Sequence, residues 1–214
     1  SNHWYHEVFK LLEENNIGWN FWTHKKVDKI TSPYSALVTP QYQTIIDYLT
    51  GAISQPDPNI AGMGLTSFAN SLKIEECITR PGVIASITDP EYGSVTKPFA
   101  PHSIPGMIPA YQYDFGVNGV SYNDSDYMND GDGGYNDGWL GRNDGVDLEG
   151  SDDDPNIPFT VGWTAAGEWL GYTIEDVSPG IYDVKFSISA LESGGLFFAR
   201  LDGQNLGVID VPST

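Results

Sequence analysis

The chain has 214 residues, of which 40% are hydrophobic and 13% aromatic, so it can pack one large or two small domains and is not globally disordered. Its formal net charge of -19 would repel nucleic acid and anionic membrane surfaces, which argues against both as partners. The single cysteine, Cys77, excludes a disulfide within the chain, and no run of residues is apolar and long enough to span a bilayer.

The first 90 residues are predicted to be rich in helix. Asn2 is expected to cap a helix over residues 3–15, because apolar residues recur there at helical spacing. Residues 17–22, IGWNFW, are apolar and aromatic and are predicted to form a short buried strand.

A second helix is expected between Thr39 and Gly51. Thr39 is a good N-cap, Pro40 suits the first helical position, and Gly51 suits the residue that ends a helix. A third helical stretch is predicted over residues 58–78. Residues 91–105 are rich in proline and lack periodicity, so they are interpreted as a linker that ends the first part of the chain, 1–90.

Residues 106–214 carry short apolar or alternating runs separated by turn residues, and this pattern predicts a β-sandwich. Asp202 and Gly203 are a good two-residue turn for a hairpin. The runs expected to form strands are 159–174, 181–190, 196–203 and 205–211.

Residues 1–88 resemble the C-terminal end of a glycoside hydrolase family 5 barrel. The run GWNFWTHKK, residues 18–26, resembles the eighth strand of that family, and LTSFANSLKIEECITRPGVIASI, residues 65–87, resembles its last helical region. The resemblance implies that Trp22 forms the floor under the sugar at the point of cleavage, whereas Trp19 is expected to pack in the core. Active sites of such barrels lie at the C-terminal ends of the strands.

A retaining glycosidase needs two carboxylates, one as nucleophile and one as acid/base. In this family both belong to earlier strands, and the nucleophile's strand is expected just upstream of Ser1. Glu7, Glu13 and Glu14 fall on the first predicted helix and are interpreted as a solvated face. We therefore expect a fragment of a larger protein, open at both ends, that contains no catalytic residue and is inactive alone.

Residues 104–214 resemble carbohydrate-binding module family 6, on the pattern VGWTAAGEWLGYTIEDVSPGIYDVKFSISA. The resemblance implies a jelly-roll sandwich that holds a glycan between aromatic side chains of its loops. Tyr135 and Trp139 are the candidates for one side of this clamp, and the other side is expected beyond Thr214. Trp163, Trp169 and Tyr172 are expected in the core, with Glu168 as a structural polar residue.

The run YNDSDYMNDGDGGYNDG, residues 122–138, has the composition of a calcium loop but fails the EF-hand template. Acids of the opening strand hold a structural calcium in the resembled module family, but here Pro109 and Tyr111 stand in place of the glutamates, leaving Gln112 and Asp114. The acids of 124–154 face only Arg142 and are interpreted as solvated, with cation binding as the minority alternative. We expect no metal site and no cofactor.

The leading hypothesis is an α+β chain in two parts, the C-terminal fragment of a (β/α)8 barrel followed by a β-sandwich. It would belong to a secreted, extracellular glycosidase, cellulase-like and retaining, whose partner is a β-glucan polysaccharide. Trp22, Tyr135 and Trp139 would touch the glycan, and we expect a monomer. The alternatives are a non-catalytic carbohydrate-binding module with a helical extension and a calcium-stabilised adhesion domain.

Overall fold

The computed structural model describes residues 1–125, 141–151, 154–190 and 194–211. Contacts divide the chain into two compact units, residues 1–177 and residues 178–214. The chain mixes helices with several small sheets, and none of the sheets within the described ranges closes on itself. The barrel end and the sandwich therefore stay predictions.

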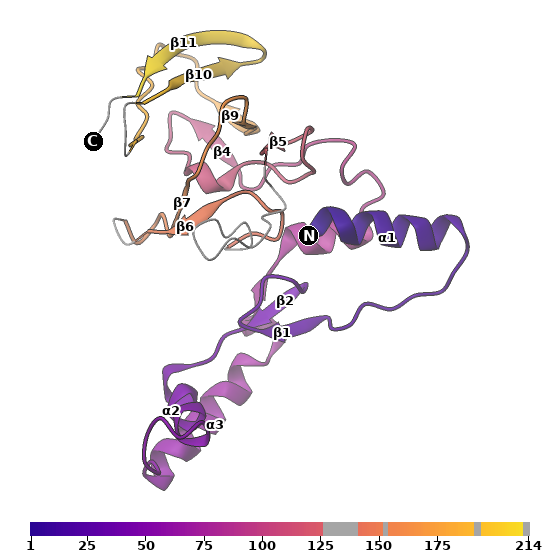
Figure 1. Cartoon of the computed structure of the whole chain (residues 1–214), viewed down its shortest axis with the longest axis vertical. Helices are drawn as coiled ribbons and strands as arrows, with labels where there is room; N and C mark the ends of the chain where they lie inside the picture. The colour runs from indigo at the N-terminus through magenta and orange to yellow at the C-terminus, as the bar shows by residue number, and fades with distance from the viewer. Residues whose placement is uncertain (126–140, 152–153, 191–193, 212–214) are drawn as a thin grey trace. The chain divides into compact units, whose positions relative to one another are not determined.

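Four α-helices lie in the first 88 residues, as expected for this part of the chain (Figure 1). They are α1 (Asn2–Glu14), α2 (Pro40–Leu49), α3 (Pro58–Ser71) and α4 (Pro81–Thr88), and two 3-10 turns are η1 (Ile74–Glu76) and η2 (Ala110–Gln112). Within the described residues, no helix has the length and apolar character that crossing a membrane requires.

Helix α2 confirms the prediction from its capping residues. The Thr39 hydroxyl accepts a hydrogen bond from the amide of Tyr42, and Gly51 follows the helix with φ of 81°. The helix packs on α3, where the rings of Tyr42 and Phe68 stack with centroids 4.0 Å apart. The predicted third helix ends at Ser71, seven residues before the expected end, because η1 and a short strand follow it.

Helix α1 confirms the predicted range but corrects its cap. Ser1, not Asn2, caps the helix, since the Ser1 hydroxyl accepts a hydrogen bond from the amide of Trp4. Asn2 is already helical and buried. Its amide donates to the carbonyl of Asn143 at 2.8 Å, and its side-chain oxygen accepts from the side chain of Asn143 at 2.8 Å. The side chain of Asn2, which was expected to cap the helix, is thus bound to Asn143, far along the chain.

The predicted strand over residues 17–22 is wrong, because these residues form no strand. The first small sheet instead has the order β1–β2–β3, with strands β1 (Lys25–Val27), β2 (Tyr34–Ala36) and β3 (Ile78–Thr79). β1 and β2 are parallel, and β2 and β3 are antiparallel. The side chains of Trp19 and Phe21 pack on α1, so they gain burial without pairing their backbone in a sheet.

In the described residues, the rest of the first unit holds three two-stranded sheets, formed by β4 (His102–Ile104) with β9 (Ile174–Val177), β5 (Tyr122–Asn123) with β8 (Trp169–Leu170), and β6 (Leu148–Gly150) with β7 (Phe159–Val161). The β4–β9 pair is parallel and the other two are antiparallel. Tyr113, Tyr122 and Val146 form a buried cluster, against which Val161, Leu170 and Tyr172 pack. The core of this region is therefore built mainly around tyrosines.

The stretch interpreted as a linker, 91–105, contains β4 and packs closely on the residues that follow it. Tyr92 is buried and donates a hydrogen bond to the carbonyl of Gly116 at 3.0 Å. Lys97 and Phe115 exchange two backbone hydrogen bonds of 3.0 Å and 2.7 Å. The domain boundaries proposed from composition stay predictions.

The prediction of a core position is wrong for Trp163 and Trp169. Trp163 and Trp169 keep 42% and 44% of their surface exposed in the described structure. Tyr172 does pack against the tyrosine cluster and donates to the carbonyl of Ala110 at 2.8 Å. Glu168 is confirmed as a structural polar residue, because its carboxylate accepts from the amide and hydroxyl of Ser125 and from the amide of Ala165.

The second unit confirms the predicted hairpin. β10 (Leu196–Leu201) and β11 (Gln204–Asp210) are antiparallel, and Leu201 pairs with Gln204 across the turn. Asp202 and Gly203 have φ of 49° and 77°, the left-handed conformation that this kind of two-residue turn requires. The strand expected over 181–190 is wrong, since residues 181–189 form no strand.

Candidate functional site

The segment that carries Trp22 is held by a set of aromatic contacts with α1. The ring of Phe9 lies 4.2 Å from that of Trp19 and 6.0 Å from that of Phe21, and Tyr5 meets Phe21 edge to face at 5.3 Å, all measured between centroids. Tyr5 and Phe9 lie on one face of α1, because residues four apart in a helix lie one turn above another. The contacts fix the path of the chain that leads to Trp22.

Trp22 lies at the surface, with 86% of its area exposed. Trp19 and Phe21 are half-buried, whereas Asn20 and Trp22 are exposed, which is the alternation of an extended chain with one face on α1. Trp19 therefore packs on α1, but it is half-buried and does not lie in the core that was expected for it. The exposed indole of Trp22 offers a flat apolar face with a polar edge, the combination that suits the C–H face of a sugar ring.

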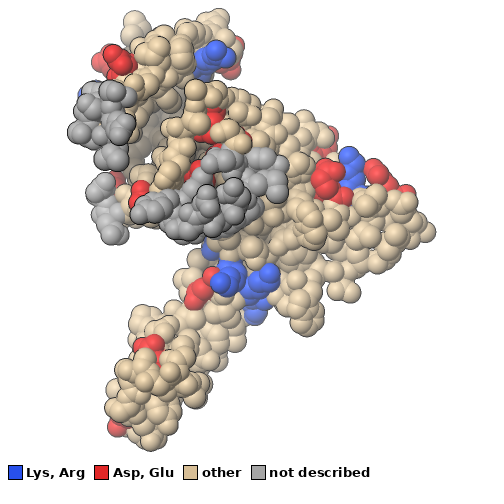
Figure 2. Space-filling view, in the orientation of Figure 1, with Lys and Arg blue, Asp and Glu red and all other residues tan. Residues whose placement is uncertain are grey.

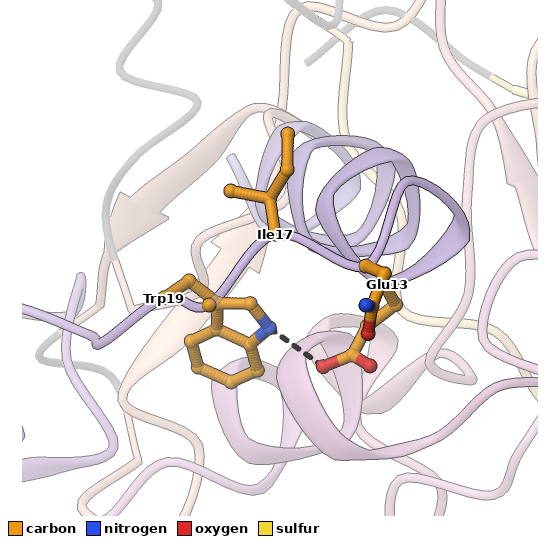
Figure 3. Close-up of a pocket in the computed structure, with 5 residues that line it drawn as sticks. Glu13, Ile17 and Trp19 are labelled. Atoms are coloured by element: carbon orange, nitrogen blue, oxygen red, sulfur yellow. Dashed lines mark hydrogen bonds between the residues drawn. The ribbon is translucent and has the colours of Figure 1, made fainter.

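A second feature of this region, an open hollow, was not foreseen. It has a volume of about 380 Å³ and is lined by Glu13, Asn16, Ile17, Gly18 and Trp19. The indole Nε1 of Trp19 donates a hydrogen bond of 2.7 Å to Oε1 of Glu13, while the side chain of Ile17 points away from both (Figure 3). Glu7, Glu13 and Glu14 are exposed on α1 as expected, but Glu13 also has this fixed partner. No local sequence pattern pairs a carboxylate with an indole across the end of a helix.

Lysines lie close to Trp22 in the sequence. Figure 2 shows lysine and arginine side chains gathered where β1 and β2 lie in Figure 1, and β1 contains Lys25 and Lys26. The ammonium of Lys25 donates to the carbonyl of Leu72, and that of Lys26 donates to the hydroxyl of Thr31 at 3.1 Å. These lysines fasten β1 to its surroundings.

The interpretation of the acids as a solvated face is wrong for part of the run. Asp124, Asp144 and Asp147 are buried. Asp144 pairs with buried Arg142, whose Nε lies 2.7 Å from Oδ2 of Asp144. Asp144 is held by Arg142 and by the hydroxyl of Tyr113, and spacing along the chain does not show these partners.

Asp114, one of the two residues left for a structural calcium, already has hydrogen-bond partners in the protein. The carboxylate of Asp114 accepts from the amide of Thr173 at 2.9 Å and from its hydroxyl at 2.6 Å. Across the described ranges, no three or more histidine, cysteine, aspartate or glutamate side chains cluster in a way that could hold a metal ion.

Tyr135 and Trp139, the two candidates for the aromatic clamp, lie outside the described residues. Of the three predicted sugar-binding residues, the described structure therefore places Trp22. No family model, curated protein or solved structure matches the chain.

Proposed function

We propose that the chain is the glycan-binding part of a secreted, modular glycoside hydrolase that acts on β-glucan by a cellulase-like, retaining mechanism. The proposal is supported by the residues that resemble a family 5 barrel end and a family 6 binding module, and by one structural observation. That observation is the exposure of Trp22, 86% of its surface, beside aromatic residues that are packed and held.

The part played by the chain in this proposal is binding rather than bond cleavage. A retaining mechanism needs two carboxyl groups about 5–5.5 Å apart on either side of the scissile bond. Glu7, Glu13 and Glu14 lie along the single helix α1, and Glu13 already accepts the indole N–H of Trp19. The nucleophile and the acid/base are expected in another part of the parent protein.

Affinity electrophoresis in gels that contain barley β-glucan tests the proposal. The wild-type chain should be retarded, W22F should keep part of the retardation, and W22A should lose it, since losing about 1.4 kcal/mol weakens binding tenfold. W163A is the matched control, because Trp163 is also exposed but belongs to another region. Unchanged retardation of W22A would sink the role of Trp22, and release of reducing sugar by the chain alone would contradict the assignment to binding.

A second candidate is a non-catalytic carbohydrate-binding module with a helical extension. It is favoured by the two hydrogen bonds between Asn2 and Asn143, because they join α1 to the β-rich region within one compact unit. This candidate places the sugar on Tyr135 or Trp139. The double variant Y135A/W139A should then lose retardation while W22A keeps it, and the opposite result favours the first candidate.

A further inference from the structure

We infer that the hollow at the C-terminal end of α1 is a second sugar-binding site, which takes a pyranose ring with neighbouring free hydroxyl groups. It goes beyond the proposed function because it does not involve Trp22, and it shares only the choice of probe with that proposal. The hollow's volume of about 380 Å³ lies in the range of small-ligand pockets, roughly 300–1,000 Å³.

The end of α1 builds the hollow by reversing the chain. Asn16 has φ of 52°, and its amide donates to the carbonyl of Glu13 at 3.0 Å, while the amide of Ile17 donates to the carbonyl of Leu12 at 2.9 Å. A left-handed residue with such hydrogen bonds is a common way to end a helix. The reversal brings Trp19 back onto the last turn, where it packs on Phe9 and meets Glu13.

Glu13 is held in place, and the polar groups of the hollow keep free capacity for a ligand. Oε1 of Glu13 accepts the indole N–H, which fixes the carboxylate. Its other oxygen, Oε2, has no protein hydrogen-bond partner among the described residues. The carboxamide of Asn16 lies at the same hollow and offers two donors and an acceptor. A carboxylate and a carboxamide together can bind two neighbouring hydroxyl groups, each of which donates and accepts.

The same chemistry disfavours charged ligands. An anion would be repelled by Glu13, and a calcium ion needs six to eight oxygens, whereas Glu13 is the only acid among the described residues that line the hollow. A neutral ring with hydroxyl groups can use the carboxylate and the carboxamide, and its C–H groups can contact the indole of Trp19. Gly18 also lines the hollow, and a Cβ at this position would meet open space.

The hollow and Trp22 are separate binding positions. Trp19 lies on the face of the segment that packs on α1, and Trp22 lies on the exposed face, in keeping with the alternation of their exposure. One site can therefore be removed without changing the other.

Gly18 provides a variant that fills the hollow without disturbing the fold. A Cβ at Gly18 would meet no heavy atom within 4 Å, and Gly18 has no positive φ. G18L should therefore fold normally and block the site. Gly62 gives the matched control, since it lies on α3 in another hollow, with Met63, Thr66 and Asn70, and its Cβ would also meet no atom within 4 Å.

The test is a titration of the full 214-residue chain, labelled with ¹⁵N, with cellotetraose. The indole N–H resonances of Trp19 and Trp22 are assigned with W19F and W22F and then followed separately. The Trp19 resonance should shift on titration in the wild type and in G62L. The affinity for cellotetraose that this resonance reports should fall at least tenfold in G18L and E13A. The loss should be smaller in E13Q, which keeps an acceptor for the indole N–H.

The outcomes separate the two proposals. If only the Trp22 resonance shifts, the second site is overturned and the proposed function is supported. If only the Trp19 resonance shifts, the second site is supported and the proposed role of Trp22 is overturned. Equal binding at Trp19 in G18L and the wild type, or an equal loss in G62L, overturns the second site. If neither resonance shifts, both proposals are wrong.

Discussion

Nε of Arg142 donates a hydrogen bond of 2.7 Å to Oδ2 of Asp144, and both side chains are buried. The guanidinium also lies 3.6 Å from the centre of the Tyr113 ring and donates to the backbone carbonyls of Tyr111 and Tyr113. The hydroxyl of Tyr113 donates to the other oxygen of Asp144 at 2.6 Å. Burial by itself would lower the pKa of Arg142, but the Asp144 carboxylate raises it above its ordinary value. Every nitrogen of the guanidinium and both carboxylate oxygens of Asp144 therefore have a hydrogen-bond partner.

Removing one partner of this pair should strongly destabilise the protein. R142M leaves the Asp144 carboxylate buried without its counter-charge, and such a loss costs about 3–5 kcal/mol. The double variant R142M/D144N should be less destabilised than the sum of its single variants. The free energy of unfolding in urea, followed by tryptophan fluorescence, measures both effects. R200M on exposed β10 is the control and should change it by no more than about 0.5 kcal/mol.

The link between Asn2 and Asn143 predicts energetic coupling between residues 141 positions apart. Each of N2A and N143A removes a partner from a buried hydrogen bond, which costs about 1–3 kcal/mol. The double variant should show a coupling energy of at least about 0.5 kcal/mol in urea unfolding. N20A, at an exposed position, serves as the control. Strictly additive effects would contradict a direct link between α1 and the region after residue 140.

Asp89 predicts part of the dependence of stability on pH. A hydrogen bond from Lys97, followed by one from the amide of Glu91, lowers the pKa of Asp89 below its ordinary value of 3.8. A carboxyl group whose pKa is lowered in the folded state stabilises the protein at pH values above its ordinary pKa. This contribution is lost as the pH falls through the pKa of the folded state. The destabilisation caused by D89N should therefore be larger at about pH 7 than at about pH 2.

Urea unfolding at the two pH values, for the wild type, D89N and K97M, measures this difference. K97M should reproduce most of the effect of D89N, because it removes the same hydrogen bond. D183N, at an exposed position, should behave like the wild type. A D89N effect that is the same at both pH values would rule out the lowered pKa as its cause.

Gly203 should be required for the hairpin of the second unit. Its φ of 77° is unfavourable for a residue with a Cβ, so G203A should cost about 1–2 kcal/mol of local stability. Gly207 lies in β11 of the same hairpin, has no positive φ and has open space around its Cβ position, so G207A should not weaken the hairpin. Amide hydrogen exchange of β10 and β11 reports the local stability directly. Equal exchange rates in the two variants would contradict the strained turn.

The predictions that succeeded depend on neighbours in the sequence. Thr39 and Pro40 start α2 through groups within one helical turn, and Asp202 with Gly203 closes the hairpin through its own backbone conformation. Glu168 holds the amide of Ala165, three residues away, by such a local bond, and it also accepts two hydrogen bonds from the distant Ser125. Such local interactions are available to the chain wherever the rest of it folds.

The predictions that failed needed a partner from far along the chain. Residues 17–22 have the composition of a strand, but a strand needs a neighbour to pair with, and α1 offered their side chains a surface instead. Trp169 was expected inside from the pattern that it shares with Tyr172, yet only Tyr172 faces the tyrosine cluster. Composition cannot specify which face of a short strand is covered.

By itself, the sequence determined the ranges of α1 and α2, the hairpin around Gly203 and the choice of Trp22 as a residue to examine, because helical periodicity, caps and turns act through local chemistry. Only the tertiary structure decided that Asn2 turns to Asn143, that Asp144 is buried with Arg142, and that Trp19 closes a hollow over Glu13. The physical reason is that burial, and the hydrogen bonds that compensate for it, depend on which distant segments meet.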